Sequence, residues 1–208
     1  NAYANGDVFH FAGGTYYVPA NAPIVTNGYT FIGSTSGQPT VFSGDLNADG
    51  IANAGDASTL LAVQMNTVHG NTAKHFVLKN IIFKNAFVNE ASKAALKIDN
   101  SGWVDVENCD FEGNVSAYQT GSDYGGAACW SYRSTVNFSD CKFHGNSAAG
   151  RGGAIKLTSN AGTKGYTTLN RCQIYDAVIP DTLPCTDENQ DKRPVFRFQI
   201  PRDRILSK

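Results

Sequence analysis

The sequence predicts an all-β fold, a single-stranded parallel β-helix (solenoid) of about five to six rungs. A short pattern recurs four times between His75 and Tyr175, as FVLKNIIFKN, VDVENCDFEG, VNFSDCKFHG and TTLNRCQIYD. The composition, with 21 glycines and 17% charged residues, suits a turn-rich β protein better than a helical one. A unit of about 30 residues cannot bury its own apolar face, so we expect the copies to stack as rungs about 4.8 Å apart.

Each copy alternates apolar and polar residues, which is typical of a strand with one buried face. Aligning the copies on their last apolar pair gives four columns that we expect to point into the coil. These columns are Phe76, Val104, Val136 and Thr167; Leu78, Val106, Phe138 and Leu169; Ile81, Cys109, Cys141 and Cys172; and Phe83, Phe111, Phe143 and Ile174. The residues between them, such as Lys79 and Glu107, are expected on the outer surface.

A second strand recurs between the copies, in AALKI at 94–98, GAACW at 126–130 and GAIKL at 153–157. Aligning these three segments predicts two further inward columns, which are Leu96, Ala128 and Ile155, and Ile98, Trp130 and Leu157. This alignment places Cys129 on the outer side of its strand.

Two short motifs accompany the repeats: Phe-x-Gly-Asn at 111–114 and 143–146, and Gly-Gly-Ala at 125–127 and 152–154. They resemble the repeats of chlamydial-type polymorphic outer membrane proteins. More broadly, roughly residues 1–178 are similar to the right-handed, pectate-lyase-like β-helix superfamily. The resemblance implies a right-handed coil, but it implies no activity, because that superfamily includes adhesins, lyases, hydrolases and phage tailspikes.

We expect residues 1–178 to form one β-helix domain with an inserted loop at 44–56. Within 1–33, GDVFHFAGGTYYV and NGYTFIGS predict the strands of a first rung. STLLAVQM fits the start of a helix or a strand, and the strand is favoured because Leu61 and Val63 match Leu96 and Ile98. Residues 179–208 form a polar linker and a basic strand, which either caps the last rung or docks on a partner.

Charge and cysteine content narrow the functional classes. A net charge of −1 and a pI near 6.5 give no electrostatic case for binding nucleic acid or an anionic membrane, and no apolar run is long enough to span a bilayer.

Of the five cysteines, Cys109, Cys141 and Cys172 are expected inside as free thiols. Cys129 and Cys185 are the better candidates for a disulfide. We expect an extracellular or cell-surface location.

The segment GDLNADGIANAGD at 44–56 predicts a Ca²⁺ site. Its oxygen donors fall at positions 1, 3, 5, 7, 9 and 12 of the EF-hand loop, with a glycine at position 6 for the turn. The donors are Asp45, Asn47, Asp49, Ile51, Asn53 and Asp56. The segment also resembles the calcium loop of dockerin repeats, which use Asp at the last position. The alternative is a turn rich in Asn, Asp and Gly that protrudes from a rung.

Loops and outward aromatic residues are the candidate ligand-binding groups, because loops carry most functional residues and exposed rings stack on sugars. The longest loop inside the repeats, at 115–124, contains Tyr118, Asp123 and Tyr124. Trp103 is expected to face outward, and so is Tyr132 if its strand extends past Trp130.

No residue is assigned a catalytic role. Lyases of this fold need calcium held by acidic side chains beside an Arg or Lys base. The outward lysines, Lys97 and Lys156, are predicted to lie two rungs apart with Cys129 between them. The sequence therefore favours a non-catalytic adhesive or structural module whose partner is a polysaccharide or a protein. The alternatives are a calcium-dependent polysaccharide lyase and an assembly module that self-associates through its solenoid ends or its tail.

Overall fold

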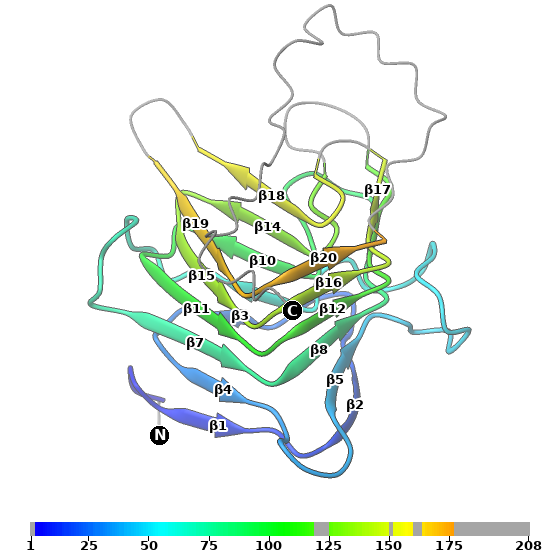
Figure 1. The fold of residues 1–208 in the computed structure, drawn as a ribbon, viewed down its shortest axis with the longest axis horizontal. Helices are drawn as coiled ribbons and strands as arrows, with labels where there is room; N and C mark the ends of the chain where they lie inside the picture. Colours follow the sequence, from blue (N-terminus) through cyan, green and yellow to red (C-terminus); the bar gives the residue numbers. More distant parts are fainter. Residues whose placement is uncertain (1–2, 119–124, 150–151, 160–163, 177–208) are drawn as a thin grey trace, which may run out of the picture.

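The computed structural model describes residues 3–118, 125–149, 152–159 and 164–176, and these confirm the predicted all-β parallel solenoid (Figure 1). The described strands form four sheets, and neighbouring strands in each sheet pair in parallel. Successive passes of the chain lie one above another in Figure 1, and each pass forms one rung.

Two of the sheets contain one strand from each of six rungs in the described part of the chain. Sheet A consists of β1 (Val8–His10), β4 (Thr30–Ile32), β7 (His75–Lys79), β11 (Trp103–Glu107), β15 (Thr135–Ser139) and β19 (Tyr166–Asn170). Sheet B consists of β2 (Gly14–Tyr17), β5 (Thr40–Ser43), β8 (Ile81–Lys84), β12 (Asp110–Glu112), β16 (Lys142–His144) and β20 (Gln173–Tyr175). The expected number of rungs and the strands predicted within residues 1–33 are therefore confirmed.

The other two sheets close the coil. Sheet C consists of β3 (Ile24–Val25), β6 (Leu61–Val63), β10 (Leu96–Asp99), β14 (Cys129–Tyr132) and β18 (Ile155–Thr158). Sheet D follows sheet B along the chain and consists of β9 (Phe87–Val88), β13 (Val115–Ser116) and β17 (Ser147–Ala148).

The strand register confirms the inner columns of the repeat. Phe111 pairs with Phe83 on one side and Phe143 on the other, and its ring stacks between theirs at centroid distances of 5.1 and 4.8 Å. The remaining buried columns are Phe76, Val104 and Val136; Leu78, Val106 and Phe138; and Ile81, Cys109 and Cys141. The last described rung contributes Thr167, Leu169, Cys172 and Ile174, which are only partly buried.

In sheet C, β14 pairs one residue away from the predicted register, whereas Ile155 shares the column of Leu96 as predicted. Leu96 pairs with Cys129, whereas the sequence alignment places Ala128 in this column. The equivalent turn residues are Gly126 and Gly152, which have positive φ angles of 75° and 67°. A Cβ atom at either position would lie within 2.6 Å of a carbonyl oxygen three residues ahead. Both positions therefore require glycine, and the Gly126 N–H donates a hydrogen bond of 2.8 Å to the Gly152 carbonyl in the observed register.

A slip of one residue exchanges the two faces of a strand. Cys129 is completely buried in the core and is a free thiol, so its predicted outward position and disulfide are wrong. Trp130, predicted to point inward, lies on the outer face, where it pairs with Lys97 on one side and Lys156 on the other. Leu157 keeps its predicted column, because it and Ile98 both pair with Ser131, and it is 41% exposed at the last described strand of sheet C.

The loop at 44–56 is an insertion that leaves the coil and returns to it. Its ends meet where the Ala57 N–H donates a hydrogen bond of 3.0 Å to the Gly44 carbonyl. The segment after it is the predicted strand and not a helix, because Leu61 in β6 pairs with Leu96 in β10. The loop projects beyond β5 in Figure 1.

Cys109, Cys141 and Cys172 are free thiols, as predicted. Cys185 and the tail at 179–208 lie outside the described residues, so the capping or docking role of the tail stays a prediction. Within the part of the chain that the structure describes, no helix has the length and apolar character needed to cross a membrane.

Candidate functional site

The outer face of sheet A carries polar and aromatic side chains, because strand alternation turns every second residue away from the core. The outward residues are His75, Val77 and Lys79 in β7; Trp103, Asp105 and Glu107 in β11; Thr135, Asn137 and Ser139 in β15; and Tyr166, Thr168 and Asn170 in β19. The parallel register brings equivalent residues of neighbouring rungs side by side, so Asp105 lies between Val77 and Asn137.

Asp105 accepts hydrogen bonds from side chains on three strands. Its Oδ2 atom lies 2.7 Å from His75 Nε2, and its Oδ1 atom accepts from Asn137 Nδ2 at 2.8 Å and from Trp103 Nε1 at 3.2 Å. The Thr168 hydroxyl donates to Asn137 Oδ1 at 2.9 Å, which extends the network to a fourth strand. We call these five residues the Asp105 cluster.

The Asp105 cluster combines a shielded acceptor with exposed rings. The side chain of Asp105 is 23% exposed, whereas that of His75 is 44% exposed. The rings of His75 and Trp103 meet edge to face at a centroid distance of 6.2 Å. Because three donors converge on one carboxylate, both rings are fixed before a partner arrives, which lowers the entropic cost of binding. A fixed, partly exposed ring is a surface on which the apolar face of a sugar can stack.

The loop at 64–74 borders this face. The Gly70 N–H is shared between the Gly102 carbonyl at 2.9 Å and Thr135 Oγ1 at 3.0 Å. The His69 ring lies 5.2 Å from the ring of Tyr166. The loop therefore extends the aromatic surface across further rungs. No local sequence pattern signals this arrangement, because it depends on contacts between residues more than one rung apart.

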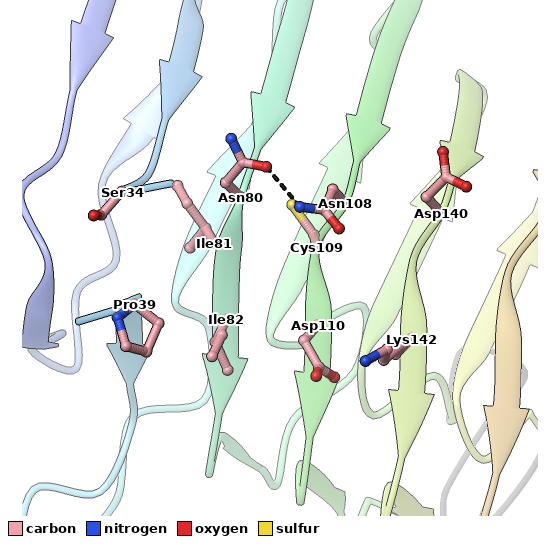
Figure 2. Close-up of a pocket in the computed structure, with 10 residues that line it drawn as sticks. All are labelled: Ser34, Pro39, Asn80, Ile81, Ile82, Asn108, Cys109, Asp110, Asp140 and Lys142. Carbon is pink, nitrogen blue, oxygen red and sulfur yellow. Dashed lines mark hydrogen bonds between the residues drawn. The ribbon is translucent and has the colours of Figure 1, made fainter. Parts of the chain in front are cut away.

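A shallow groove of about 210 Å³ lies where sheet A turns into sheet B (Figure 2). Asn80, Asn108 and Asp140 occupy this turn in three successive rungs, with positive φ angles of 58°, 49° and 55°. Asn108 Nδ2 donates a hydrogen bond of 2.8 Å to Asn80 Oδ1. The other lining residues are Ser34, Pro39, Ile81, Ile82, Cys109, Asp110 and Lys142. We call this feature the corner groove; it is smaller than a typical small-molecule pocket of about 300 Å³ or more.

Two carboxylates of the corner groove have opposite electrostatic environments. Burial raises the pKa of Asp110, and the nearby His144, whose Nε2 lies 2.9 Å from Oδ1, partly offsets this increase. Arg171 lowers the pKa of Asp140 through two hydrogen bonds, from Nε at 2.6 Å and from Nη2 at 2.5 Å. Within one groove, the environment of Asp110 therefore disfavours the ionised carboxylate and that of Asp140 favours it.

A second aromatic group lies on the outer face of sheet C. The rings of Trp130 and Tyr132 stack at 5.7 Å with an interplanar angle of 16°. Lys97 Nζ lies 5.6 Å from the centre of the Trp130 ring, and the Arg133 guanidinium lies 5.3 Å from that of Tyr132. Trp130 is only 3% exposed, so its ring is not available for stacking in the way that Trp103 is.

The structure does not bring the predicted ligand-binding residues together. Trp103 lies on sheet A and joins the Asp105 cluster, whereas Tyr132 lies on sheet C. Tyr118 follows β13 and is half-buried. Asp123 and Tyr124 lie outside the described residues.

The charged groups considered for a lyase lie on two different sheets. Lys97 and Lys156 flank Trp130 on sheet C, and not Cys129 as predicted. Asp105 and Glu107 lie on sheet A. These acidic and basic residues therefore do not form one cluster.

The loop at 45–56 orients its acidic side chains through its own backbone. Asp45 accepts hydrogen bonds from the backbone N–H groups of Asp49 and Gly50 at 3.1 and 2.9 Å. Asp56 accepts from the Asn53 N–H at 2.8 Å. The first and last carboxylates of the predicted calcium motif are thus held in place within the folded loop.

The amides of this loop surround Asp49. Asn47 and Asn53 each direct Nδ2 at Asp49 Oδ2, at 3.1 and 2.5 Å. A half-turn of either amide would present its oxygen in place of its nitrogen. With the Ile51 carbonyl, the loop then offers three carboxylates, two amides and one carbonyl, which are hard donors that suit Ca²⁺. No group of three or more His, Cys, Asp or Glu side chains in the described ranges lies close enough to hold a metal, so amide and carbonyl oxygens are needed here.

The repeat itself is similar to a known family. Residues 140–158 match the Chlamydia polymorphic membrane protein repeat. This segment begins at Asp140 in the corner groove, contains Phe143 and Asn146 of the second Phe-x-Gly-Asn motif, and ends at Thr158, the last residue of β18. Comparisons with curated proteins and with solved structures found no match.

Proposed function

We propose that this chain is a non-catalytic β-helix module of a cell-surface protein, and that it adheres to a polysaccharide through the outer face of sheet A. The observation that carries the proposal is the Asp105 cluster, in which one carboxylate fixes His75, Trp103 and Asn137 from three neighbouring strands. The match of residues 140–158 to a membrane-protein repeat supports the surface location.

The hydrogen bonding of Asp105 supports binding in preference to catalysis. Both carboxylate oxygens already accept hydrogen bonds from neighbouring side chains. Such a carboxylate is suited to positioning other residues. Outward side chains recur at each rung, about 4.8 Å apart, along the axis of the coil. A linear polymer of sugar units that lies along this axis can therefore contact outward side chains of several rungs.

Binding to defined polysaccharides tests this proposal. The folded chain would be titrated with polygalacturonate, alginate and neutral dextran, and migration in affinity gels would be compared with that of two variants. Trp103→Ala should weaken binding to the preferred polymer about fivefold, since stacking on an aromatic ring contributes about 1 kcal/mol. Tyr17→Ala is the matched control, because Tyr17 is exposed on sheet B and lies away from the cluster.

Two results would contradict the proposal. One is equal binding, or no binding, by the parent chain and Trp103→Ala with all three polymers. The other is the appearance of unsaturated sugar products, read as ultraviolet absorbance during incubation with Ca²⁺ and the acidic polymers. That second result would favour the alternative of a calcium-dependent lyase.

We also propose that the loop at 45–56 binds Ca²⁺ and that the ion rigidifies this insertion. The donor set and its spacing support this assignment, as does the preformed bonding of Asp45 and Asp56. The expected ligands are Asp45, Asn47, Asp49, Ile51, Asn53 and Asp56.

A further inference from the structure

We propose that Cys172 is a reactive thiol and that Cys141, in the neighbouring rung, resolves its oxidised form as a disulfide between the two rungs. This inference is independent of the polysaccharide proposal. It concerns the column of cysteines inside the corner between sheets A and B, which the adhesive role does not use.

The strand register stacks the cysteine column in a regular way. The Gln173 N–H donates a hydrogen bond of 2.9 Å to the Cys141 carbonyl, which fixes Cys172 in the rung next to Cys141. Each thiol is directed at the carbonyl oxygen two residues earlier in the chain, at 3.3 Å for Cys141 and 3.4 Å for Cys172. Neighbouring parallel strands lie about 4.8 Å apart, which is within the Cα separation of about 4.4–6.8 Å that disulfides require.

Position in the coil distinguishes Cys172 from the other described cysteines. Cys109, Cys129 and Cys141 are buried. Burial raises the pKa of the Cys109 and Cys129 thiols, and the interaction with Cys172, followed by burial, raises the pKa of Cys141. Cys172 is partly exposed in the last described rung, so an oxidant can reach it. A disulfide needs the two Cβ atoms closer than the strand spacing, at about 3.8 Å. Within the described residues β20 pairs with β16 alone, and forming the disulfide requires β20 to move toward β16.

The charge environment of Cys172 favours the thiolate. Hydrogen bonding from the Cys141 thiol is the main cause, and it lowers the pKa of Cys172 to about 7 against the opposing effect of partial burial. The facing charged groups are Asp140, which opposes ionisation, and Arg171, which is paired with Asp140. Thiolates are the nucleophilic form of cysteine, so Cys172 is the thiol expected to react first.

The oxidation can be written with hydrogen peroxide as the oxidant. The Cys172 thiolate attacks one peroxide oxygen, the O–O bond breaks, and the departing hydroxide takes the thiol proton as water, which leaves a sulfenic acid. The Cys141 sulfur then attacks the Cys172 sulfur, the S–O bond breaks, and the hydroxide leaves as water with the Cys141 proton. Two thiols are oxidised and one peroxide is reduced to two waters.

Alkylation kinetics and peptide mapping test the proposal on the full chain. Iodoacetamide should label Cys172 at least about tenfold faster than Cys109, Cys129 or Cys141, with a midpoint near pH 7. After peroxide treatment, mapping should recover a Cys141–Cys172 disulfide, and the chain should have lost two hydrogen atoms. The same disulfide should form in Cys185→Ser, which excludes that thiol as the partner.

Two variants separate hydrogen bonding from simple packing. Cys141→Ser keeps a donor, so it should retain the low labelling midpoint but form no disulfide. Cys141→Ala removes the donor, so the midpoint should move up toward the ordinary thiol value of about 8.5. A parent chain that labels all cysteines at similar rates, a Cys109–Cys141 or Cys172–Cys185 cross-link, or equal midpoints in the two variants would overturn the proposal.

Discussion

The side-chain amide of Asn114 donates a hydrogen bond of 2.9 Å to Oδ1 of Asn146 in the next rung, and both residues are completely buried. Asn114 Nδ2 also reaches the Phe83 carbonyl at 3.1 Å, and Asn114 Oδ1 accepts from the Ala86 N–H at 3.0 Å. Asn146 Nδ2 repeats this pattern with the Phe111 carbonyl at 2.8 Å. The asparagine of the Phe-x-Gly-Asn motif therefore satisfies backbone groups at a corner where no strand can do so.

The first prediction concerns this buried asparagine ladder. Asn114→Leu should lower the free energy of unfolding by about 3 kcal/mol or more, because it leaves several buried polar groups without partners. Asn170→Ala, at an exposed position of β19, should change it by less than about 0.5 kcal/mol. Urea denaturation followed by circular dichroism measures both values. Equal stability of the two variants would show that the ladder contributes little.

The second prediction concerns the stacked phenylalanines. Phe111 is buried between Phe83 and Phe143, so Phe111→Ala should cost about 3–5 kcal/mol through lost burial and the cavity that it leaves. Phe111→Leu retains much of the volume and should cost less. Tyr17→Ala, which truncates an exposed ring, is the control. Thermal and urea unfolding measure the stability of each variant. The prediction is wrong if Phe111→Ala and Tyr17→Ala have the same free energy of unfolding.

Much of the fold follows from the repeat, because stacking rungs turns sequence periodicity directly into columns. Phe83, Phe111 and Phe143 share one position in the pattern and one column in the structure. The error in sheet C has an equally local cause. Two adjacent glycines in each of the two later copies allow two alignments, and the pairing of Cys129 with Ile155 shows that Gly126 and Gly152 are equivalent.

The candidate site was predictable only in part. Alternation along β11 places Trp103 outside, and this expectation was correct. The convergence of His75, Asn137 and Trp103 on Asp105 was not foreseen, because these residues come from three separate copies of the repeat. Which outward residues meet depends on the lateral register and on the chosen rotamers. The sequence of a single repeat specifies neither the lateral register nor the rotamers.

The third prediction concerns the loop at 45–56. Adding Ca²⁺ should raise the melting temperature of the parent chain, since at about 100 times the dissociation constant a bound ligand stabilises the folded state by about 2.7 kcal/mol. Asp45→Asn should abolish most of this shift, because it removes the first carboxylate of the loop. Glu90→Gln, which alters an exposed carboxylate outside the loop, should keep it. Calorimetry with Ca²⁺ and with chelator makes the comparison, and an unchanged parent chain would rule out the site.

The fourth prediction concerns pH and the two carboxylates of the corner groove. Arg171 lowers the pKa of Asp140 in the folded chain, so the unfolded chain binds more protons below about pH 3.9 and stability rises with pH in that window. Asp140→Asn keeps a residue that tolerates positive φ and should remove this rise. The pair is exposed, so added salt should weaken its effect in the parent chain.

The fifth prediction has the opposite sign, because burial raises the pKa of Asp110 despite the opposing charges of His144 and Lys142, while Glu112 adds to the increase. Between about pH 3.9 and the raised pKa, the folded chain binds more protons than the unfolded chain. Stability should therefore fall as pH rises through this window, and Asp110→Asn should flatten the fall. Urea denaturation at closely spaced pH values measures both slopes. If Asp110→Asn and Asp140→Asn change the pH dependence in the same direction, the environments assigned to the two carboxylates are wrong.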